Sequence, residues 1–280
     1  MGAVESLINT LAFPCPPRNY SEAVLRRRPD LVFLRTKSNK RIPAIYKRAL
    51  NPEHGTGHTV LYSHGNAEDV GIALAYIDEL SHELSVDVLA YEYLGYSISD
   101  GEPSESGVYE SIDAAVDFLT GQCGVPLGSI VVFGRSLGSA PTVHIASTRP
   151  KIAGVVLQSP LASGLRVLHG VSASLLLKPF DPFQNYAKIR RVSCPAVVMH
   201  GTADEVVPFW NGQSLHDALQ RKGLAHEPLW AQGHGHNDMP EHACMQHARG
   251  FLASLPTPPG RAGPAPHSDD VPMPNEVHVG

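Results

Sequence analysis

The pentapeptide "GRSLG" at positions 134–138 combines residue types that could do chemistry. It follows the apolar run "SIVVF", and a run compatible with a helix comes after it. A serine between glycines at a strand-to-helix corner is the pattern of a nucleophile elbow, because the strained backbone leaves no room for a neighbouring Cβ. A structural turn that needs small residues is the alternative. The strand before it and the helix after it favour Ser136 as a nucleophile.

A serine nucleophile needs a base at neutral pH, and the base needs a carboxylate to orient it. After such an elbow the order along the chain is serine, acid, histidine. The expected acid is Asp204, which follows the apolar run "AVVMHG"; Glu205 is an alternative, and capping of the next helix is a non-catalytic explanation. The segment "AQGHGHNDM" offers His234 and His236, and spacing alone does not choose between these bases. The same histidines with Asp238 would also fit a metal site.

Acyl transfer also needs two backbone N–H groups where negative charge develops. One is expected from Leu137, the residue after the serine. The other is expected from Asn66 in "YSHGNAEDVG", because this loop follows a strand-like run and contains a flexible His-Gly pair. An ordinary turn is the alternative explanation of that pair. Three separate pieces in the required order favour a hydrolase that uses the triad without any metal or organic cofactor.

The elements that must position these residues alternate along the chain. Short β-branched runs bounded by Gly or Pro are typical of buried parallel strands, and helical patterns separate them. Such alternation predicts an α/β fold with a mostly parallel sheet, helices on both faces and functional residues at the carboxyl ends of strands. The expected strands are an antiparallel opening pair, 30–36 and 41–48, followed by 58–65, 86–93, 129–136, 152–160, 194–201 and 226–233.

Composition narrows the class of protein. The chain has 280 residues, 42% hydrophobic and 18% charged, which is enough for one sizeable domain. A formal net charge of −5 gives no reason to expect nucleic acid as a partner. The four cysteines lack paired spacing, which favours a reducing compartment. We see neither an apolar run near the ~20 residues of a membrane span nor the start of a secretory signal.

Several strings resemble the α/β-hydrolase-domain-17 family, serine hydrolases that remove palmitate from cysteines of membrane-associated proteins. They are "LYSHGNAEDVG", "YEYLGYSISDGEPSE", "SIVVFGRSLGSAPTVHIAS", "HGTADEVVPFWNG" and "EPLWAQGHGHND". The likeness runs from about Asp30 to Leu255. It implies an α/β-hydrolase fold with a minimal lid, and it aligns His236 and Asp204 with the catalytic histidine and acid.

Two departures from the family pattern stand out. The family carries a cluster of N-terminal cysteines that are palmitoylated, whereas this chain has Cys15 alone in that region. Its elbow has Arg135 and Leu137 where glutamine and isoleucine are common. The elbow tolerates such changes, so the departures bear on membrane attachment rather than on the chemistry.

Residues 1–28 are therefore predicted to anchor the protein to membranes by other means. Gly2 and Ser6 match the N-myristoylation pattern, and Cys15 is a candidate for palmitoylation. The arginines 26–28 would meet an anionic leaflet. One acyl chain binds only marginally, so a second signal is expected. An ordinary helix packed on the domain is the alternative.

The expected organisation is this anchor, a catalytic domain over residues 29–255 and a disordered Pro-rich tail over 256–280. The apolar segment 167–183 is either a short lid over an acyl groove or a buried helix. The expected function is palmitoyl-protein thioesterase, with S-acylated membrane-associated proteins as substrates. The expected location is the cytoplasmic face of membranes, and in part the cytosol. A carboxylesterase or lipase is the alternative, and a non-catalytic binding protein is a third reading.

Overall fold

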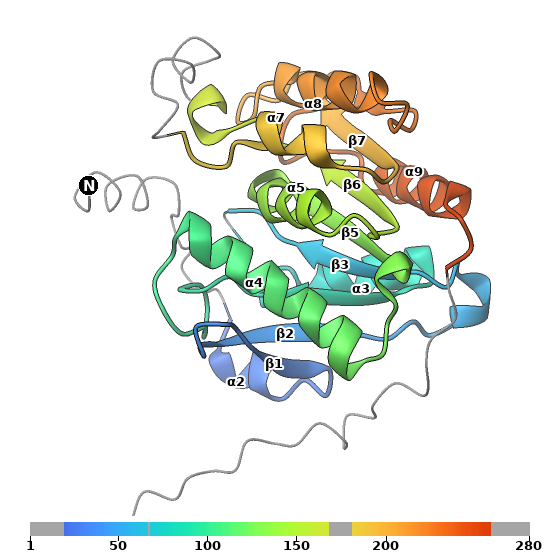
Figure 1. Cartoon of the computed structure of the whole chain (residues 1–280). Helices are drawn as coiled ribbons and strands as arrows, with labels where there is room; N and C mark the ends of the chain where they lie inside the picture. The colour runs from blue at the N-terminus through green and yellow to red at the C-terminus, as the bar shows by residue number, and fades with distance from the viewer. Residues whose placement is uncertain (1–19, 67, 168–180, 259–280) are drawn as a thin grey trace, which may run out of the picture.

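The computed structural model describes residues 20–66, 68–167 and 181–258, and within them one eight-stranded sheet forms the centre (Figure 1). The strand order is β1-β2-β4-β3-β5-β6-β7-β8. The strands are β1 (Leu31–Arg35), β2 (Arg41–Lys47), β3 (Thr59–Ser63), β4 (Asp87–Tyr91), β5 (Ile130–Arg135), β6 (Gly154–Gln158), β7 (Ala196–Gly201) and β8 (Leu229–Ala231).

The sheet is antiparallel at one edge and parallel elsewhere. β2 pairs antiparallel with both β1 and β4, and every later pair is parallel. The chain passes from β3 outward to β4 and then returns to the other side of β3 with β5. This reversal of direction is the place where open α/β sheets bind ligands, at the carboxyl ends of the strands.

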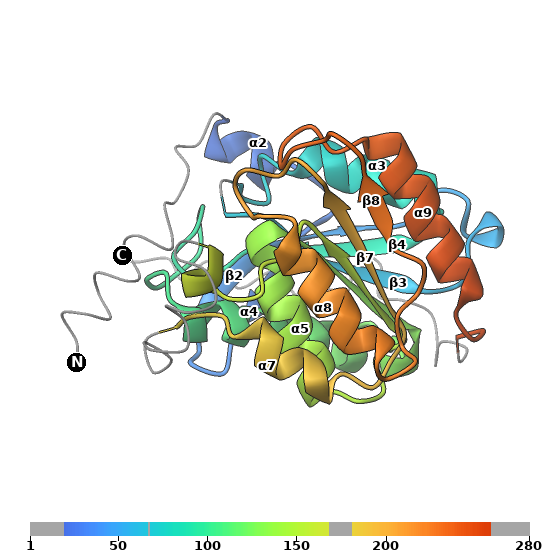
Figure 2. The same ribbon diagram turned by 90° about the horizontal axis from the view of Figure 1, so that it is seen from above.

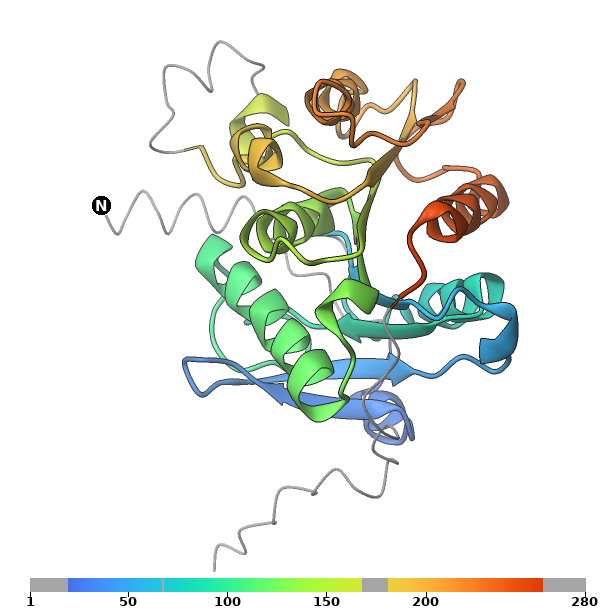
Figure 3. The same ribbon diagram turned by 45° about the vertical axis from the view of Figure 1, so that its right-hand side comes forward.

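Helices cover both faces of the sheet, as Figures 2 and 3 show. α4, α5, α7 and α8 lie on one side, and α3 and α9 on the other. Alternate residues of β3 enter the two cores: Leu61 belongs to one, and Val60 and Tyr62 belong to the other. The helices are α2 (Glu22–Arg26), α3 (Leu74–Leu84), α4 (Glu105–Asp117), α5 (Ser139–Thr148), α7 (Asn185–Lys188), α8 (Trp210–Gln220) and α9 (Glu241–Ser254), with a π-helical turn at Phe118–Gln122.

This arrangement confirms the predicted mostly parallel sheet with helices on both faces. Helix α3 begins at Leu74, and residues 69–73 before it are not part of the helix. The Asp69 carboxylate accepts a hydrogen bond from the Ile72 amide at 2.8 Å, which stabilises a turn before the helix. The acylation candidates Gly2 and Cys15, most of the lid candidate and the tail from residue 259 lie outside the described residues.

Candidate active site

Ser136 lies on a sharp corner between β5 and α5. A single 3₁₀ turn over 136–138 joins the two elements, and Ser136 has φ +52°, in the left-handed region that strains a serine. The neighbouring glycines are required by close approach. A Cβ on Gly134 would lie 2.3 Å from the carbonyl oxygen of Gly138, and a Cβ on Gly138 would lie 2.0 Å from that of Ser63. The backbone therefore presents the serine side chain at the carboxyl edge of the sheet.

Two loops bring an imidazole and a carboxylate to this serine. His236 follows β8, and its Nε2 accepts a hydrogen bond from the Ser136 hydroxyl at 3.0 Å. Its Nδ1 donates to Oδ2 of Asp204, which follows β7, at 2.7 Å. Because the carboxylate can only accept, the imidazole proton lies on Nδ1 and the lone pair of Nε2 faces the hydroxyl. The arrangement can take the serine proton and stabilise the resulting imidazolium.

The Asp204 carboxylate is buried, and protein groups donate several hydrogen bonds to it. Its Oδ1 accepts from the amides of Val206 at 3.0 Å and Val207 at 2.7 Å. Burial by itself would raise the pKa of Asp204, but hydrogen bonds from His200, His236 and the Val207 amide outweigh it and hold the pKa well below its usual range. Asp204 is therefore ionised at neutral pH.

The alternative residues have other surroundings. Glu205 is exposed. His234 Nδ1 donates to the carbonyl oxygen of Asp238 at 2.7 Å, and the Asp238 carboxylate accepts from the Gly235 amide at 2.6 Å. His236, rather than His234, contacts the serine. Within residues 20–66, 68–167 and 181–258, no group of three or more histidine, cysteine or carboxylate side chains is placed to hold a metal ion.

The two segments expected to supply the oxyanion donors approach the serine from different sides. Leu137 is the next residue in the 3₁₀ turn. The loop after β3 approaches from the other side, since a Cβ on Gly65 would lie 3.8 Å from the Cβ of Ser136. The following residue, Asn66, accepts a hydrogen bond from the Tyr96 hydroxyl on its side-chain oxygen at 2.7 Å. A carbonyl group at Ser136 would thus lie between the two segments that carry these amides.

A buried glutamate holds the loop after β3, and sequence reasoning missed it. Glu92 Oε1 accepts from His64 Nε2 at 2.8 Å and from the Tyr93 amide at 2.9 Å, and its Oε2 accepts from the Val70 amide at 2.9 Å. Burial alone would lower the pKa of His64, but the Glu92 carboxylate raises it. A carboxylate inside the apolar run "VDVLAYEY" was the available signal.

An ion pair links the same loop to the elbow. Arg135 donates to Glu68 Oε1 at 2.5 Å, and Glu68 Oε2 accepts from the Gly65 amide at 3.3 Å. Glu68 thus links Arg135, the residue before the serine, to Gly65, the residue before Asn66. The sequence marked Arg135 as unusual for the family but gave no partner for it.

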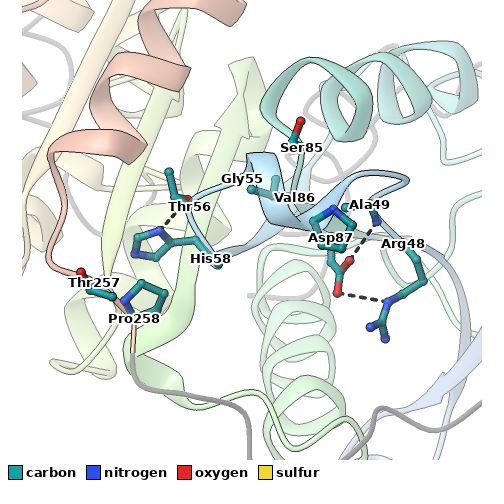
Figure 4. Close-up of a pocket in the computed structure, with 12 residues that line it drawn as sticks. Arg48, Ala49, Gly55, Thr56, His58, Ser85, Val86, Asp87, Thr257 and Pro258 are labelled. Atoms are coloured by element: carbon teal, nitrogen blue, oxygen red, sulfur yellow. Dashed lines mark hydrogen bonds and ion pairs between the residues drawn. The ribbon is translucent and has the colours of Figure 1, made fainter.

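The hollow drawn in Figure 4 lies elsewhere in the molecule. It has a volume of about 610 Å³ and is lined by residues near the amino ends of β3 and β4, with Thr257 and Pro258. Its charged groups already have partners: Asp87 accepts from the Ala49 amide at 2.9 Å and pairs with Arg48 at 3.1 Å. Ser136 lies at the opposite, carboxyl end of the strands, so this hollow takes no part in the site.

Comparison with solved structures identifies the fold. The esterase Pf2001 from Pyrococcus furiosus superposes with a TM-score of 0.61 at 20% identity, over 86% of this chain and 98% of that chain. The shared architecture is the α/β-hydrolase fold. A sequence model of the prolyl oligopeptidase family matches residues 171–252, the part that carries the acid and the histidine.

Closer relatives are found by sequence. α/β-Hydrolase domain-containing protein aho-3 of Caenorhabditis elegans is 39% identical over 225 residues, 80% of this chain and 65% of that protein. α/β-Hydrolase domain-containing protein 17B of Xenopus tropicalis is 37% identical over 210 residues, 75% of this chain and 70% of that protein. The chain belongs to this α/β-hydrolase-domain-17 family. It spans less than two thirds of the length of the C. elegans relative.

Proposed function

We propose that the protein is a serine hydrolase that cleaves the thioester of S-palmitoylated proteins. The observation that carries the proposal is the continuous hydrogen-bonded chain from Asp204 through His236 to Ser136, at 2.7 and 3.0 Å. The family resemblance supports the choice of substrate. The triad alone supports acyl transfer in general.

In the first half of the reaction, Ser136 Oγ attacks the carbonyl carbon of the acyl-cysteine thioester while His236 Nε2 takes the hydroxyl proton. The amides of Leu137 and Asn66 stabilise the negative oxygen of the tetrahedral intermediate. When the intermediate collapses, the C–S bond breaks and the cysteine sulfur leaves with the proton from His236. The fatty acyl group is then an ester of Ser136.

Water completes the cycle by the same route. His236 takes a proton from the water that attacks the acyl-serine carbonyl, and the second tetrahedral intermediate uses the same two amides. Its collapse releases the fatty acid, and the proton returns to Ser136 Oγ. Asp204 stays ionised throughout and stabilises the imidazolium twice in each turnover. His236 carries every proton in these steps, so the cycle needs no other acid or base.

The substrate class also implies a place of action. S-acylated proteins hold their acyl chains in the bilayer, so the proposed enzyme works at the cytoplasmic face of membranes as a peripheral protein. Among the helices of the described ranges, none has the length and apolar character needed to cross a bilayer. We assign attachment to the N-terminal segment, with Gly2 and Cys15 as the acylation sites.

One experiment separates the proposal from its alternative, a carboxylesterase or lipase. Purified protein is offered a palmitoyl thioester and the oxyester with the same acyl chain and a leaving group of similar size. We expect a higher kcat/KM on the thioester, and we expect Ser136→Ala to abolish hydrolysis of both and labelling by a fluorophosphonate probe. A preference for the oxyester would favour the alternative. Full activity of Ser136→Ala would remove the triad from the mechanism.

A further inference from the structure

The carboxylate of Asp204 contacts a second imidazole. His200 lies on β7, four residues before Asp204, and its side chain is fully buried. Its Nε2 lies 3.1 Å from Asp204 Oδ2 and 2.9 Å from the carbonyl oxygen of Val207. Both neighbours are acceptors, so Nε2 carries a proton and donates it to these two oxygens. The oxygen that His236 uses is therefore shared by two imidazole donors.

The packing around His200 fixes its ring. A Cβ on Gly212 of α8 would lie 2.4 Å from His200 Nδ1, so only a glycine lets the helix approach this closely. The ring of Phe209 meets the imidazole edge-on, with centroids 5.8 Å apart. Nδ1 is buried and has no hydrogen-bond partner among the described residues. An unpaired buried nitrogen is unfavourable. If the side chain at position 200 served only for packing, an apolar residue would be more stable there.

We propose that His200 is a positioning residue for the reaction, acting through Asp204; this inference rests on the proposed triad. The amides of Val206 and Val207 hold Oδ1, and His200 holds Oδ2 at the angle from which it accepts the Nδ1 proton of His236. Without His200, Oδ2 keeps only the hydrogen bond from His236, so the carboxylate is less firmly oriented and holds the imidazole less precisely towards Ser136.

The length of the side chain at position 200 gives a matched pair of variants. In His200→Gln the amide nitrogen reaches about as far as Nε2 and can donate to Asp204. In His200→Asn a chemically similar amide stops short of it. We expect His200→Asn to lower kcat roughly 10- to 100-fold with little change in KM, because small misplacements near the reacting atoms have effects of this size. We expect His200→Gln to recover most of the loss.

His216 of α8 provides the control. It is also buried, and its ring lies 5.5 Å from that of Trp230. We expect His216→Asn to keep wild-type kcat. Equal activity of the Asn and Gln variants at position 200 would overturn the proposal, as would an equal loss from His216→Asn.

A double-mutant cycle separates positioning from a general structural effect. If His200 acts through Asp204, His200→Asn should cost little more in an Asp204→Asn background than Asp204→Asn alone. The same fold-loss in both backgrounds would overturn the proposal. The cycle is measured on a small activated ester and by the rate of fluorophosphonate labelling. These measurements depend on the triad and remain valid even if palmitoyl thioesters prove not to be substrates. Activity of Ser136→Ala, by contrast, would overturn the proposed function itself.

Discussion

His234 and His236 lie in one loop, but their rings have different partners. His236 bridges Asp204 and Ser136, whereas His234 is 39% exposed and contacts the Asp238 backbone. We expect His236→Ala to lower kcat by roughly a thousandfold or more, as loss of a triad base does. His234→Ala should have a small effect. Steady-state kinetics on one ester substrate checks both, and the reverse order would contradict the assignment.

The two adjacent acids allow a similar comparison. Asp204→Asn keeps the shape of the side chain, but its amide can present a donor to His236 and the imidazole then carries its proton on the wrong nitrogen. The expected loss in kcat is roughly 10⁴-fold. Glu205→Gln, an exposed change, should leave kcat near the wild-type value. Kinetic assays in which Glu205→Gln is the more damaging change would show that the acid is misassigned.

The lowered pKa of Asp204 also predicts how stability depends on pH. A carboxyl whose pKa is lower in the folded state stabilises it above the unfolded pKa, about 4, and this contribution is lost as pH falls through the folded value. The difference in melting temperature between wild type and Asp204→Asn should therefore change little from pH 7 to 5. Below pH 4, wild type should lose stability relative to Asp204→Asn. A difference that stays constant down to pH 3 would contradict the lowered pKa.

The sequence supplied the serine, the acid and a pair of candidate histidines, because each follows a recognisable strand. It could not supply His200, Glu92 or Glu68 as partners. His64 and Glu92 lie 28 residues apart, and no periodicity reports which buried polar groups meet. The choice of His236 over His234 came from family resemblance, and the hydrogen bonds now give a physical reason for it.

At the scale of elements, the elbow is a junction where three segments touch. The carbonyl of Ser63 at the end of β3 lies where a Cβ of residue 138 would be. We expect Gly138→Ala to destabilise the fold by about 1–3 kcal/mol through overpacking and to displace Ser136, with loss of probe labelling. Gly121→Ala is the control, since nothing lies within 4 Å of its Cβ. Denaturant unfolding of both variants tests the contrast, and equal stability would contradict it.

The strands themselves were predictable, but their order was not. Apolar runs bounded by Gly or Pro marked the six strands after the opening antiparallel pair, since such runs are typical of burial on both faces of a sheet. Burial does not report which strand lies beside which, so the return of β5 to the free side of β3 could only be seen in the structure. That return is what brings the loop after β3 to the serine.

At the scale of the molecule, the N-terminal segment joins the domain at the active-site edge. The Tyr20 hydroxyl donates to Asp69 at 2.9 Å and lies 2.8 Å from Ser97, in the loops after β3 and β4. Its ring packs on Gly71, where a Cβ would lie 2.1 Å from it. An anchor upstream of Tyr20 would thus hold the edge that carries Ser136 close to the membrane.

The arginines predicted to face the leaflet are partly engaged within the protein. Arg28 pairs with Asp30 at 2.7 Å and with Asp78 at 3.2 Å, and Arg26 pairs with Glu22 at 2.6 Å. Leu25 of α2 is fully buried, so this short helix packs on the domain. In the proposed anchor these arginines would therefore contribute less electrostatic attraction than three free arginines, and the proposed acylation would contribute more of the binding.

We therefore expect the Gly2→Ala, Cys15→Ser double variant to move largely to the soluble fraction. It should keep wild-type activity on a soluble thioester and lose activity on membrane-bound S-acylated proteins, because its active site is unchanged but no longer held at the bilayer. Each single variant should show an intermediate distribution, since two weak anchors add in free energy and multiply in affinity. Ser136→Ala is the control: it should stay with membranes while losing all activity. Fractionation of cell lysates measures the distribution, and a double variant that remains with membranes would show that attachment does not depend on acylation of Gly2 and Cys15.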